Sequence, residues 1–232
     1  MIVIHPLCHS ACLPAGQACP ESFFILDSGS TDYIFNGIVR HDKRWNKPFT
    51  ILAGRIRIFT PMKTIATISN KDFGLKETKD EDELELRNAA RAVLFNEKSE
   101  MAIIAVPTGN YHKIPGGGVE EGEDTEGALK REILEEVGCE AEIIGEIGQI
   151  LEFRDPIKQY SYGYIAQVKG EIGQPKFTAS EKEADFQLAE WMPIEEAIGI
   201  FEEDKPNFLM AKFMSKRDKM FLEKAKEIME DK

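Results

Sequence analysis

The 232-residue sequence contains no apolar run close to the roughly 20 residues that a membrane-spanning helix needs. It also lacks an excess of positive charge, since 29 Lys and Arg residues face 41 Asp and Glu residues for a formal net charge of −12. A protein this acidic has no broad basic surface for nucleic acid, although metal ions can still bridge it to phosphates. We therefore expect a cytoplasmic protein with neither a membrane span nor a nucleic-acid partner.

Cysteine is scarce, and three of the four cysteines fall within the first 19 residues. Together with His5 and His9, the residues Cys8, Cys12 and Cys19 suggest a zinc site, because thiolate and imidazole are zinc ligands. Their spacing matches no zinc-finger pattern, and no second ligand pair follows downstream. The same stretch lacks the positive start of a secretory signal and is interrupted by prolines. We expect an unstructured tail here rather than a zinc module.

The first 61 residues differ in composition from the rest of the chain. They hold six Lys and Arg against four Asp and Glu, a balance of +2, so the remainder carries −12 − 2 = −14. Prolines interrupt any helical period, while the apolar runs 23–26 and 49–59 are compatible with short strands. We interpret 1–61 as a poorly structured or dispensable extension, such as an upstream start codon would add.

The remainder divides into a lead-in and a domain. The sequence from Met62 to Ile68 is typical of the start of a small domain, and the charged residues up to 83 suggest a linker. From 84 to 232, strands and helices alternate around one core, which predicts an α/β domain. Periodicity and turn signals predict strands at 87–95, 101–106, 141–153, 159–168 and 189–192, and helices from Pro193 and from about Pro206. The last helix is expected to carry one apolar stripe, which packs on the core and is formed by Leu209, Phe213, Met220, Phe221, Ala225 and Ile228.

The stretch from Pro115 to Gly138 stands out from its surroundings. Three consecutive glycines, Gly116 to Gly118, allow the backbone to turn tightly and to approach a ligand. An acidic helix follows, which Asp124 or Thr125 can cap and Gly138 can end. Within it Glu132, Glu135 and Glu136 stand at i, i+3 and i+4, so the three carboxylates share one helix face. Like charges repel at this spacing, whereas a hard divalent cation is held well by it, and we predict a metal site.

The same stretch closely resembles the Nudix box, the signature of the Nudix hydrolases, written G-x5-E-x7-R-E-U-x-E-E-x-G-U with U an apolar residue. One departure is Cys139, where the family usually has a branched aliphatic residue, and a buried cysteine acts as a small hydrophobe. The resemblance implies the Nudix fold, an α/β/α sandwich with a mixed sheet between helices. The matching residues are Gly117, Glu123, Arg131, Glu132, Ile133, Glu135, Glu136, Gly138 and Cys139.

The resemblance also implies the chemistry, which is hydrolysis of a nucleoside diphosphate linked to another group with Mg²⁺ as cofactor and Mn²⁺ as a substitute. Glu132 and Glu136 are the first expected metal ligands, with Glu135 and the carbonyl of Gly116 next to them. Glu123 is a further metal candidate from the loop, because nine residues before Glu132 it would face away on a continuous helix. Arg131 is expected to orient a carboxylate, and it counts among the catalytic candidates.

The general base has three candidates. One is the box glutamate Glu135, and the other two, Glu181 and Glu183, lie in the later loop 178–185. Substrate contacts are expected from the glycine loop, at Gly117 and Gly118. Tyr111, which precedes that loop, and Tyr162, one of three alternating tyrosines, are further substrate candidates. The alternating tyrosines are equally compatible with packing on the sheet face.

The substrate itself is a small-molecule nucleotide, and a homodimer remains an option. We favour a nucleoside triphosphate, with an oxidised base included, which would release a nucleoside monophosphate. ADP-ribose or another sugar nucleotide is the alternative, because Pro156 lies near the proline expected of that subgroup. A non-catalytic nucleotide-binding regulatory module is the alternative of another class, although such proteins typically lose box glutamates and none is lost here.

Overall fold

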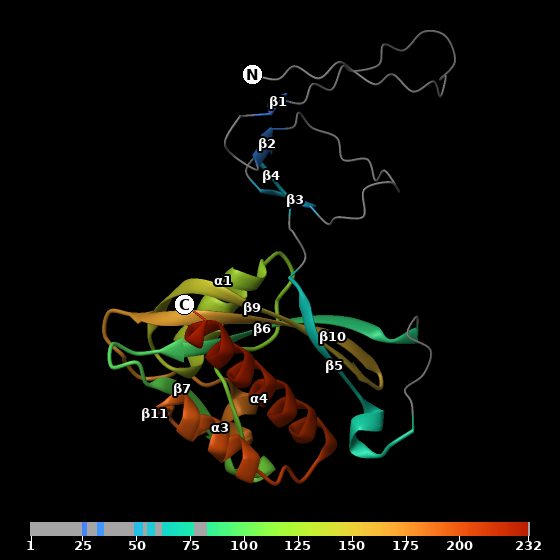
Figure 1. The fold of residues 1–232 in the computed structure, drawn as a ribbon, viewed down its shortest axis with the longest axis vertical. Helices are drawn as coiled ribbons and strands as arrows, with labels where there is room; N and C mark the ends of the chain where they lie inside the picture. Colours follow the sequence, from blue (N-terminus) through green and yellow to red (C-terminus); the bar gives the residue numbers. More distant parts are fainter. Residues whose placement is uncertain are drawn as a thin grey trace. The chain divides into compact units, whose positions relative to one another are not determined.

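Figure 1 shows the fold in a computed structural model of the chain. The structure describes residues 62–76 and 83–231 together with the backbone of four short strands in the first 61 residues. Contacts between Cα atoms divide the chain into two compact units, Met1–Pro61 and Met62–Lys232. Each unit is therefore described by itself.

The strands of the N-terminal unit form an antiparallel sheet in the order β1-β2-β4-β3. Three of them lie within the apolar runs that the sequence singled out. The zinc candidates between His5 and Cys19 lie outside the described residues. The strands are β1 (Ile25–Leu26), β2 (Asp32–Ile34), β3 (Phe49–Leu52) and β4 (Arg55–Ile58).

The second unit is built on a mixed seven-stranded sheet, which confirms the predicted α/β class. Its order is β11-β7-β6-β10-β9-β5, with β8 paired to β7 off this path. Strand β10 runs parallel to β6 and antiparallel to β9, and β5 runs parallel to β9. The strands are β5 (Thr64–Ser69), β6 (Glu85–Phe95), β7 (Met101–Val106), β8 (Tyr111–Lys113), β9 (Glu140–Arg154), β10 (Ile157–Lys169) and β11 (Glu190–Met192).

The described part of the lead-in, residues 62–76, is more structured than its sequence suggested. Residues Thr64–Ser69 form β5 at the edge of the sheet, and a 3₁₀ turn, Asn70–Phe73, follows. Ile68 is fully buried and aligns with Glu152 of β9. An edge strand needs only a short apolar face, and its partner is about 80 residues away in sequence, so no local pattern reveals the pairing. The stretch that was expected to begin a small domain therefore contributes an edge strand to the sheet.

Strands β6 and β7 separate soon after their turn, which makes room for the glycine loop. They are paired at Phe95 and Met101. Beyond that point the edge of β6 that β7 leaves unpaired bonds to the loop instead, with Ala90 N–H donating to Gly117 O and Ala92 N–H to Pro115 O, each at 2.9 Å. The loop is thus held against the sheet by main-chain hydrogen bonds.

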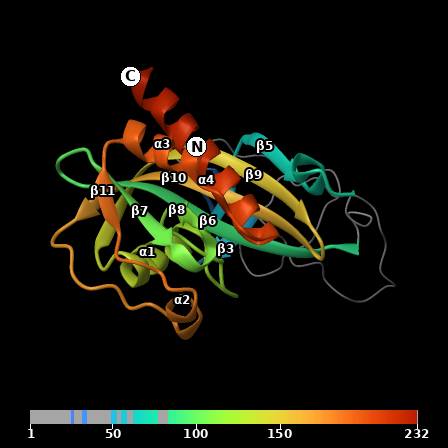
Figure 2. The same ribbon diagram turned by 90° about the horizontal axis from the view of Figure 1, so that it is seen from below.

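Helices cover both faces of the sheet, as the predicted sandwich requires (Figures 1 and 2). One apolar cluster, which includes Leu129 and Ile133, joins α1 to one face. A second cluster, which includes Phe201, Phe213 and Phe221, joins α3 and α4 to the other face. Within the described residues, none of the helices is both long and apolar enough to span a bilayer. The helices are α1 (Thr125–Glu136), α2 (Ala179–Glu183), α3 (Ile194–Glu203) and α4 (Leu209–Glu230).

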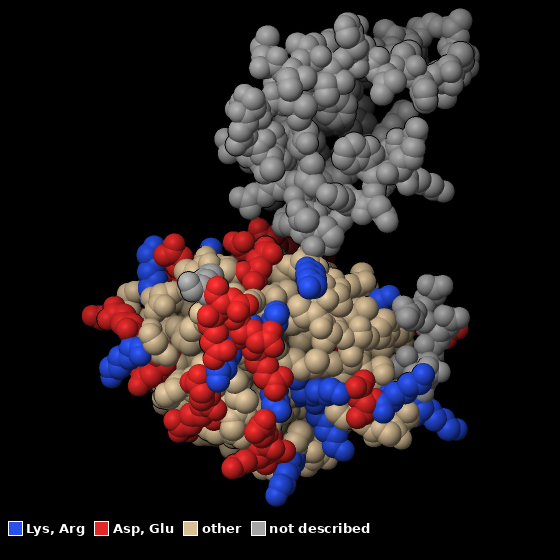
Figure 3. Space-filling view, viewed as in Figure 1, with Lys and Arg blue, Asp and Glu red and all other residues tan. Residues whose placement is uncertain are grey.

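The apolar stripe predicted on the last helix faces the core over most of its length. Phe213, Phe221 and Ala225 are fully buried, whereas Leu209 in the first turn is 38% exposed. Outside this stripe, α4 forms ion pairs with α3, such as that between Lys226 Nζ and Glu195 Oε1 at 3.2 Å. Figure 3 shows acidic side chains gathered over α3 and α4, with basic ones among them.

Candidate metal centre

Helix α1 has well-defined ends, and these fix the direction in which its carboxylates point. Asp124 caps the helix by accepting a hydrogen bond from Gly127 N–H at 2.7 Å. Gly138 follows the helix at φ +80°, a left-handed conformation that favours glycine. Leu129 and Ile133 are fully buried against the sheet. With that face buried, the glutamates of the last turns lie next to the glycine loop.

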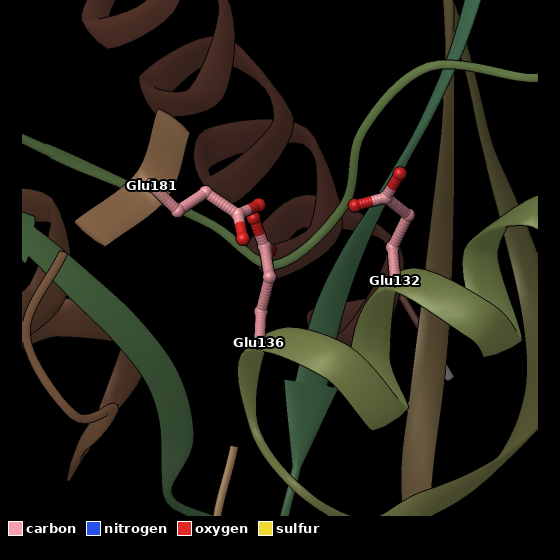
Figure 4. Close-up of side chains that lie close together, drawn as sticks. All are labelled: Glu132, Glu136 and Glu181. Atoms are coloured by element: carbon pink, nitrogen blue, oxygen red, sulfur yellow. The ribbon is translucent and has the colours of Figure 1, made fainter. Parts of the chain in front are cut away.

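Three carboxylates meet beside this loop. Glu132 and Glu136 come from α1 and Glu181 comes from α2, and one oxygen of each lies within 4.8 Å of the others. Figure 4 shows Glu181 and Glu136 pointing toward one another, with Glu132 on the preceding turn of the same helix as Glu136. Glu132 and Glu136 are buried, and Glu181 is half-buried. Oxygen ligands at this separation suit a hard divalent cation such as Mg²⁺.

Gly117 lies against the carboxylate of Glu132. A Cβ atom at this position would collide with all three carboxyl-group atoms of that side chain. Glycine here is therefore needed for the close approach of the loop to the helix. The neighbouring Gly118 offers its carbonyl oxygen to Arg131 at 3.0 Å, and the Arg87 side chain lies next to it on β6.

Glu136 is only 1% exposed, and its two oxygens have separate partners. One oxygen accepts a hydrogen bond from Gly116 N–H at 2.8 Å, and the other forms an ion pair with Lys113. Burial raises the pKa of Glu136, while Lys113 and the Gly116 N–H act to lower it. Lys113 was not among the expected site residues, because a single lysine before a glycine loop carries no sequence signal of its own.

Arg131 joins the loop to the carboxylates. Its Nε and Nη2 atoms donate to the two oxygens of Glu123, each at 2.9 Å. Its Nη1 atom donates to Glu132 at 2.9 Å and to Glu135 at 3.2 Å. The pKa of Arg131 is raised, first by the hydrogen bond with Glu123 and also by Glu132. This set of contacts orients the carboxylate of Glu132, as a planar fork of donors can.

Glu123 and Glu135 were both expected near a metal, and the structure gives them other partners. Glu123 lies in the loop before α1, and both of its oxygens bind Arg131. Its pKa is lowered by that arginine. Glu135 is half-exposed and binds Arg131 from the next turn of the helix. Neither belongs to the group of three clustered carboxylates among the described residues.

The two glutamates proposed from the later loop are separated by the structure. Residues Ala179–Glu183 form the short helix α2 instead of a loop, because Thr178 and Glu181 cap its start reciprocally. Thr178 N–H donates to Glu181 at 2.6 Å. This turn directs Glu181 into the carboxylate group, while Glu183 is exposed to solvent.

The tyrosine candidates have different environments. Tyr111 is 5% exposed and packs with Val106 and Ala211, and its hydroxyl lies 3.4 Å from the Met214 sulfur. A ring this deeply buried has no face to offer a substrate, so Tyr111 is a packing residue. Tyr162 is half-buried on the α1 side of the sheet, where burial raises its pKa.

A buried ionic network between α4, β9 and the start of the glycine loop was not predicted. Asp218 of α4 is fully buried and accepts a hydrogen bond from Ile114 N–H at 3.1 Å, directly before the glycine loop. Its neighbour Arg217 donates to Asp218 at 2.7 Å and to Glu152 of β9 at 3.2 Å. Burial lowers the pKa of nearby Arg91 to about 10. The network ties α4 and β9 to the start of the loop.

Comparison with known proteins adds an independent result. The model of the NUDIX domain matches residues 85–214, which contain the glycine loop, α1 and α2. Human diphosphoinositol polyphosphate phosphohydrolase 3-alpha is 26% identical over 133 residues, covering 56% of this chain and 78% of that protein. An RNA pyrophosphohydrolase of Wolbachia pipientis is 40% identical over 67 residues, covering 28% of this chain and 41% of that protein.

Solved structures of similar proteins were also found. A MutT protein from Methanosarcina mazei aligns over 62% of this chain and 96% of its own, at 17% identity and a TM-score of 0.44. A NUDIX hydrolase from Nitrosomonas europaea aligns over 61% of this chain and 88% of its own, at 18% identity and a TM-score of 0.46.

Proposed function

Because the chain belongs to the Nudix hydrolase family, we propose that it hydrolyses a nucleoside diphosphate linked to a further group, with Mg²⁺ as cofactor. We favour a nucleoside triphosphate as the substrate, oxidised bases included, and a nucleoside monophosphate as one product. The observation that carries this proposal is the group formed by Glu132, Glu136 and Glu181 beside the glycine loop. Carboxylates so close together repel one another unless a cation or a proton intervenes.

The residues present fit a magnesium ion. Glu132 and Glu136 would hold it with carboxylate oxygens, the carbonyl of Gly116 would add a neutral oxygen, and Mn²⁺ would accept the same ligands. Bound there, the cation would neutralise diphosphate charge and help to activate and orient an attacking water. Gly117 and Gly118 are proposed to bring main-chain atoms close to the phosphates, because neither carries a side chain that would block the approach.

Arg131, Glu181 and Glu135 are proposed to orient a metal ligand or to accept a proton. Arg131 keeps the Glu132 carboxylate in one orientation through the hydrogen bond at 2.9 Å. We assign to Glu181 the acceptance of the proton from the attacking water, because its oxygen lies within 4.8 Å of those of both box glutamates. Glu135 is the second candidate for that role, and its contact with Arg131 keeps it on the same side of α1.

ADP-ribose or another sugar nucleotide is the second candidate substrate, because Pro156 lies near the proline expected of that subgroup, later by a residue or two. The relatives are named for diphosphoinositol polyphosphates and for RNA, so the family resemblance alone does not select a nucleotide. A non-catalytic nucleotide-binding module is disfavoured because the glutamates of the box are all retained.

The test is a panel of nucleoside triphosphates, oxidised triphosphates, sugar nucleotides, ADP-ribose and diphosphoinositol polyphosphates, each with Mg²⁺ and with identification of both products. We expect turnover of a nucleoside triphosphate to the monophosphate, and loss of this turnover in Glu136→Gln without loss of the fold. Preferred turnover of ADP-ribose would replace the favoured substrate. Absence of metal-dependent turnover across the panel would contradict the proposal.

A further inference from the structure

Lys113 brings a buried positive charge into the group of carboxylates. It ends β8 and precedes the glycine loop by two residues, and its side chain is 3% exposed. Its Nζ atom is ion-paired with Glu136 and donates a hydrogen bond to Gly116 O at 3.2 Å. The ring of Phe186 lies on another side of the ammonium, with 4.7 Å between Nζ and the ring centroid. The ammonium is therefore held by two oxygens and an aromatic face.

Both oxygens belong to residues that the proposed function assigns to the metal ion. Mg²⁺ coordinates oxygen at about 2.0–2.1 Å and requires a lone pair of each ligand in a near-octahedral arrangement. An ammonium has three N–H donors, and that of Lys113 already contacts both of these oxygens. Two cations on one buried carboxylate also repel strongly, because little solvent screens them. The ammonium and the metal ion therefore exclude each other from these oxygens.

We propose that Lys113 is an intramolecular competitor of the catalytic metal ion, whose ammonium must leave Glu136 and the Gly116 carbonyl before the metal can bind them. This inference rests on the proposed metal centre. The ion pair keeps a deeply buried carboxylate neutralised, since an unpaired buried charge is strongly unfavourable. The same ion pair weakens metal binding, because the free energy of the lost pair is subtracted from that of coordination.

The competition is tested by neutral replacements of Lys113. The full chain carrying Lys113→Met or Lys113→Gln is stripped of metal, and Mn²⁺ binding without substrate is followed by calorimetry and by electron paramagnetic resonance at one fixed pH. We expect both variants to bind Mn²⁺ about tenfold or more tightly than the wild type. Lys98→Met, which removes an exposed lysine of the turn between β6 and β7, should leave the affinity unchanged. Unchanged or weaker binding in either Lys113 variant would overturn the proposal.

A second measurement uses the wild-type chain and does not depend on the folding of the variants. In protein labelled with ¹⁵N at lysine side chains, we expect one slowly exchanging Nζ resonance, because Lys113 is buried and hydrogen-bonded. Saturation with Mg²⁺ should abolish that resonance or shift it strongly. If the resonance is absent without metal, or if it persists unchanged at saturation, the competition is wrong.

The competition by Lys113 and the metal centre on which it rests are refuted by different results. If the wild type binds Mn²⁺ and the Lys113 variants bind it equally well, only the competition is refuted. If neither the wild type nor Glu136→Gln binds Mn²⁺, the proposed metal centre is refuted, and the competition is refuted with it.

Discussion

At the scale of single residues, Gly117 carries a requirement that only the folded chain reveals. The box pattern contains a glycine there, but the pattern does not say what a side chain would meet. In the structure it would meet the carboxylate of Glu132, a proposed metal ligand. Gly117 therefore leaves the space that the carboxylate of Glu132 occupies.

We predict that Gly117→Ala lowers the affinity for Mg²⁺ and lowers kcat, by about tenfold or more, because Glu132 must move out of its position. The matched control is Gly145→Ala in β9, where a Cβ atom meets open space. The measurement is a magnesium titration of the initial rate. Equal rates for the Gly117 and Gly145 variants would show that Glu132 moves without consequence.

The pair of Glu123 and Arg131 makes stability depend on pH. Arg131 lowers the pKa of Glu123 below its ordinary value of 4.5, so the folded state favours the ionised carboxylate. The contribution is therefore present above about pH 4.5 and is lost as the pH falls through the lowered folded-state pKa. We predict that the difference in unfolding free energy between the wild type and Glu123→Gln is constant near neutrality and shrinks below pH 4.5.

Urea unfolding of both proteins from pH 3 to pH 7 checks this dependence, with pH steps of about half a unit. A difference that grows toward low pH would contradict the sign of the pKa shift.

The thiol of Cys139 offers a third residue-scale prediction. Burial raises its pKa to about 11, so the thiol stays protonated at neutral pH in the folded protein. In a chain with Cys8, Cys12 and Cys19 replaced by serine, we expect no alkylation of Cys139 by iodoacetamide at pH 8 until the protein is unfolded. Rapid alkylation of the native protein would show that the end of α1 opens.

At the scale of elements, α4 does more than cover the sheet. Its apolar residues pack on one face, and between them Asp218 holds Ile114 at the entrance of the glycine loop. The sequence predicted the apolar stripe of α4 from periodicity. It did not predict the buried contacts of Arg217 and Asp218, because Glu152 of β9 and the Ile114 N–H are about 65 to 105 residues away.

We predict that Asp218→Asn lowers the free energy of unfolding by about 3–5 kcal/mol, because it removes the charge of one of the two carboxylates that pair with the buried Arg217. The control is Lys224→Ala on the same helix, where the pair with Glu227 is exposed and is worth under about 1 kcal/mol. Denaturant unfolding of the three proteins measures both effects. Similar losses in the two variants would mean that the network is as weak as a surface ion pair.

Element types inside the domain were predictable wherever a segment carries its own signal. Strand β7 is continuously apolar, and α3 begins after Pro193 as expected. Strand β5 and helix α2 were missed as elements, because one is an edge strand with a distant partner and the other is a single turn fixed by its cap. Local patterns thus predicted the box and named Glu181 as one of three candidates for the general base, whereas the ion pair of Lys113 with Glu136 forms only in the folded chain.

At the scale of the whole molecule, the boundary between the two units falls at Met62, directly before β5. We predict that a chain of residues 62–232 unfolds cooperatively and keeps its hydrolase activity, because all strands of the mixed sheet are retained. A chain of residues 84–232 should be destabilised by about 1.5–3 kcal/mol or more, because it loses the buried side chain of Ile68.

Thermal unfolding and activity assays of both shortened chains test the boundary. If the chain of residues 62–232 is insoluble or inactive, the first 61 residues are not dispensable. If the chain of residues 84–232 is as stable as the longer one, β5 contributes nothing to the sheet.

Folding is proposed to assemble one catalytic centre from the metal ligands Glu132 and Glu136 and the proton acceptor Glu181, on two helices about 45 residues apart. The most direct measurement is kcat at saturating Mg²⁺ for Glu132→Gln, Glu136→Gln and Glu181→Gln, beside Glu183→Gln on the exposed side of α2. We predict losses of about 100-fold or more for the first three variants and less than about twofold for the last. Loss of activity in Glu183→Gln with full activity in Glu181→Gln would contradict the account.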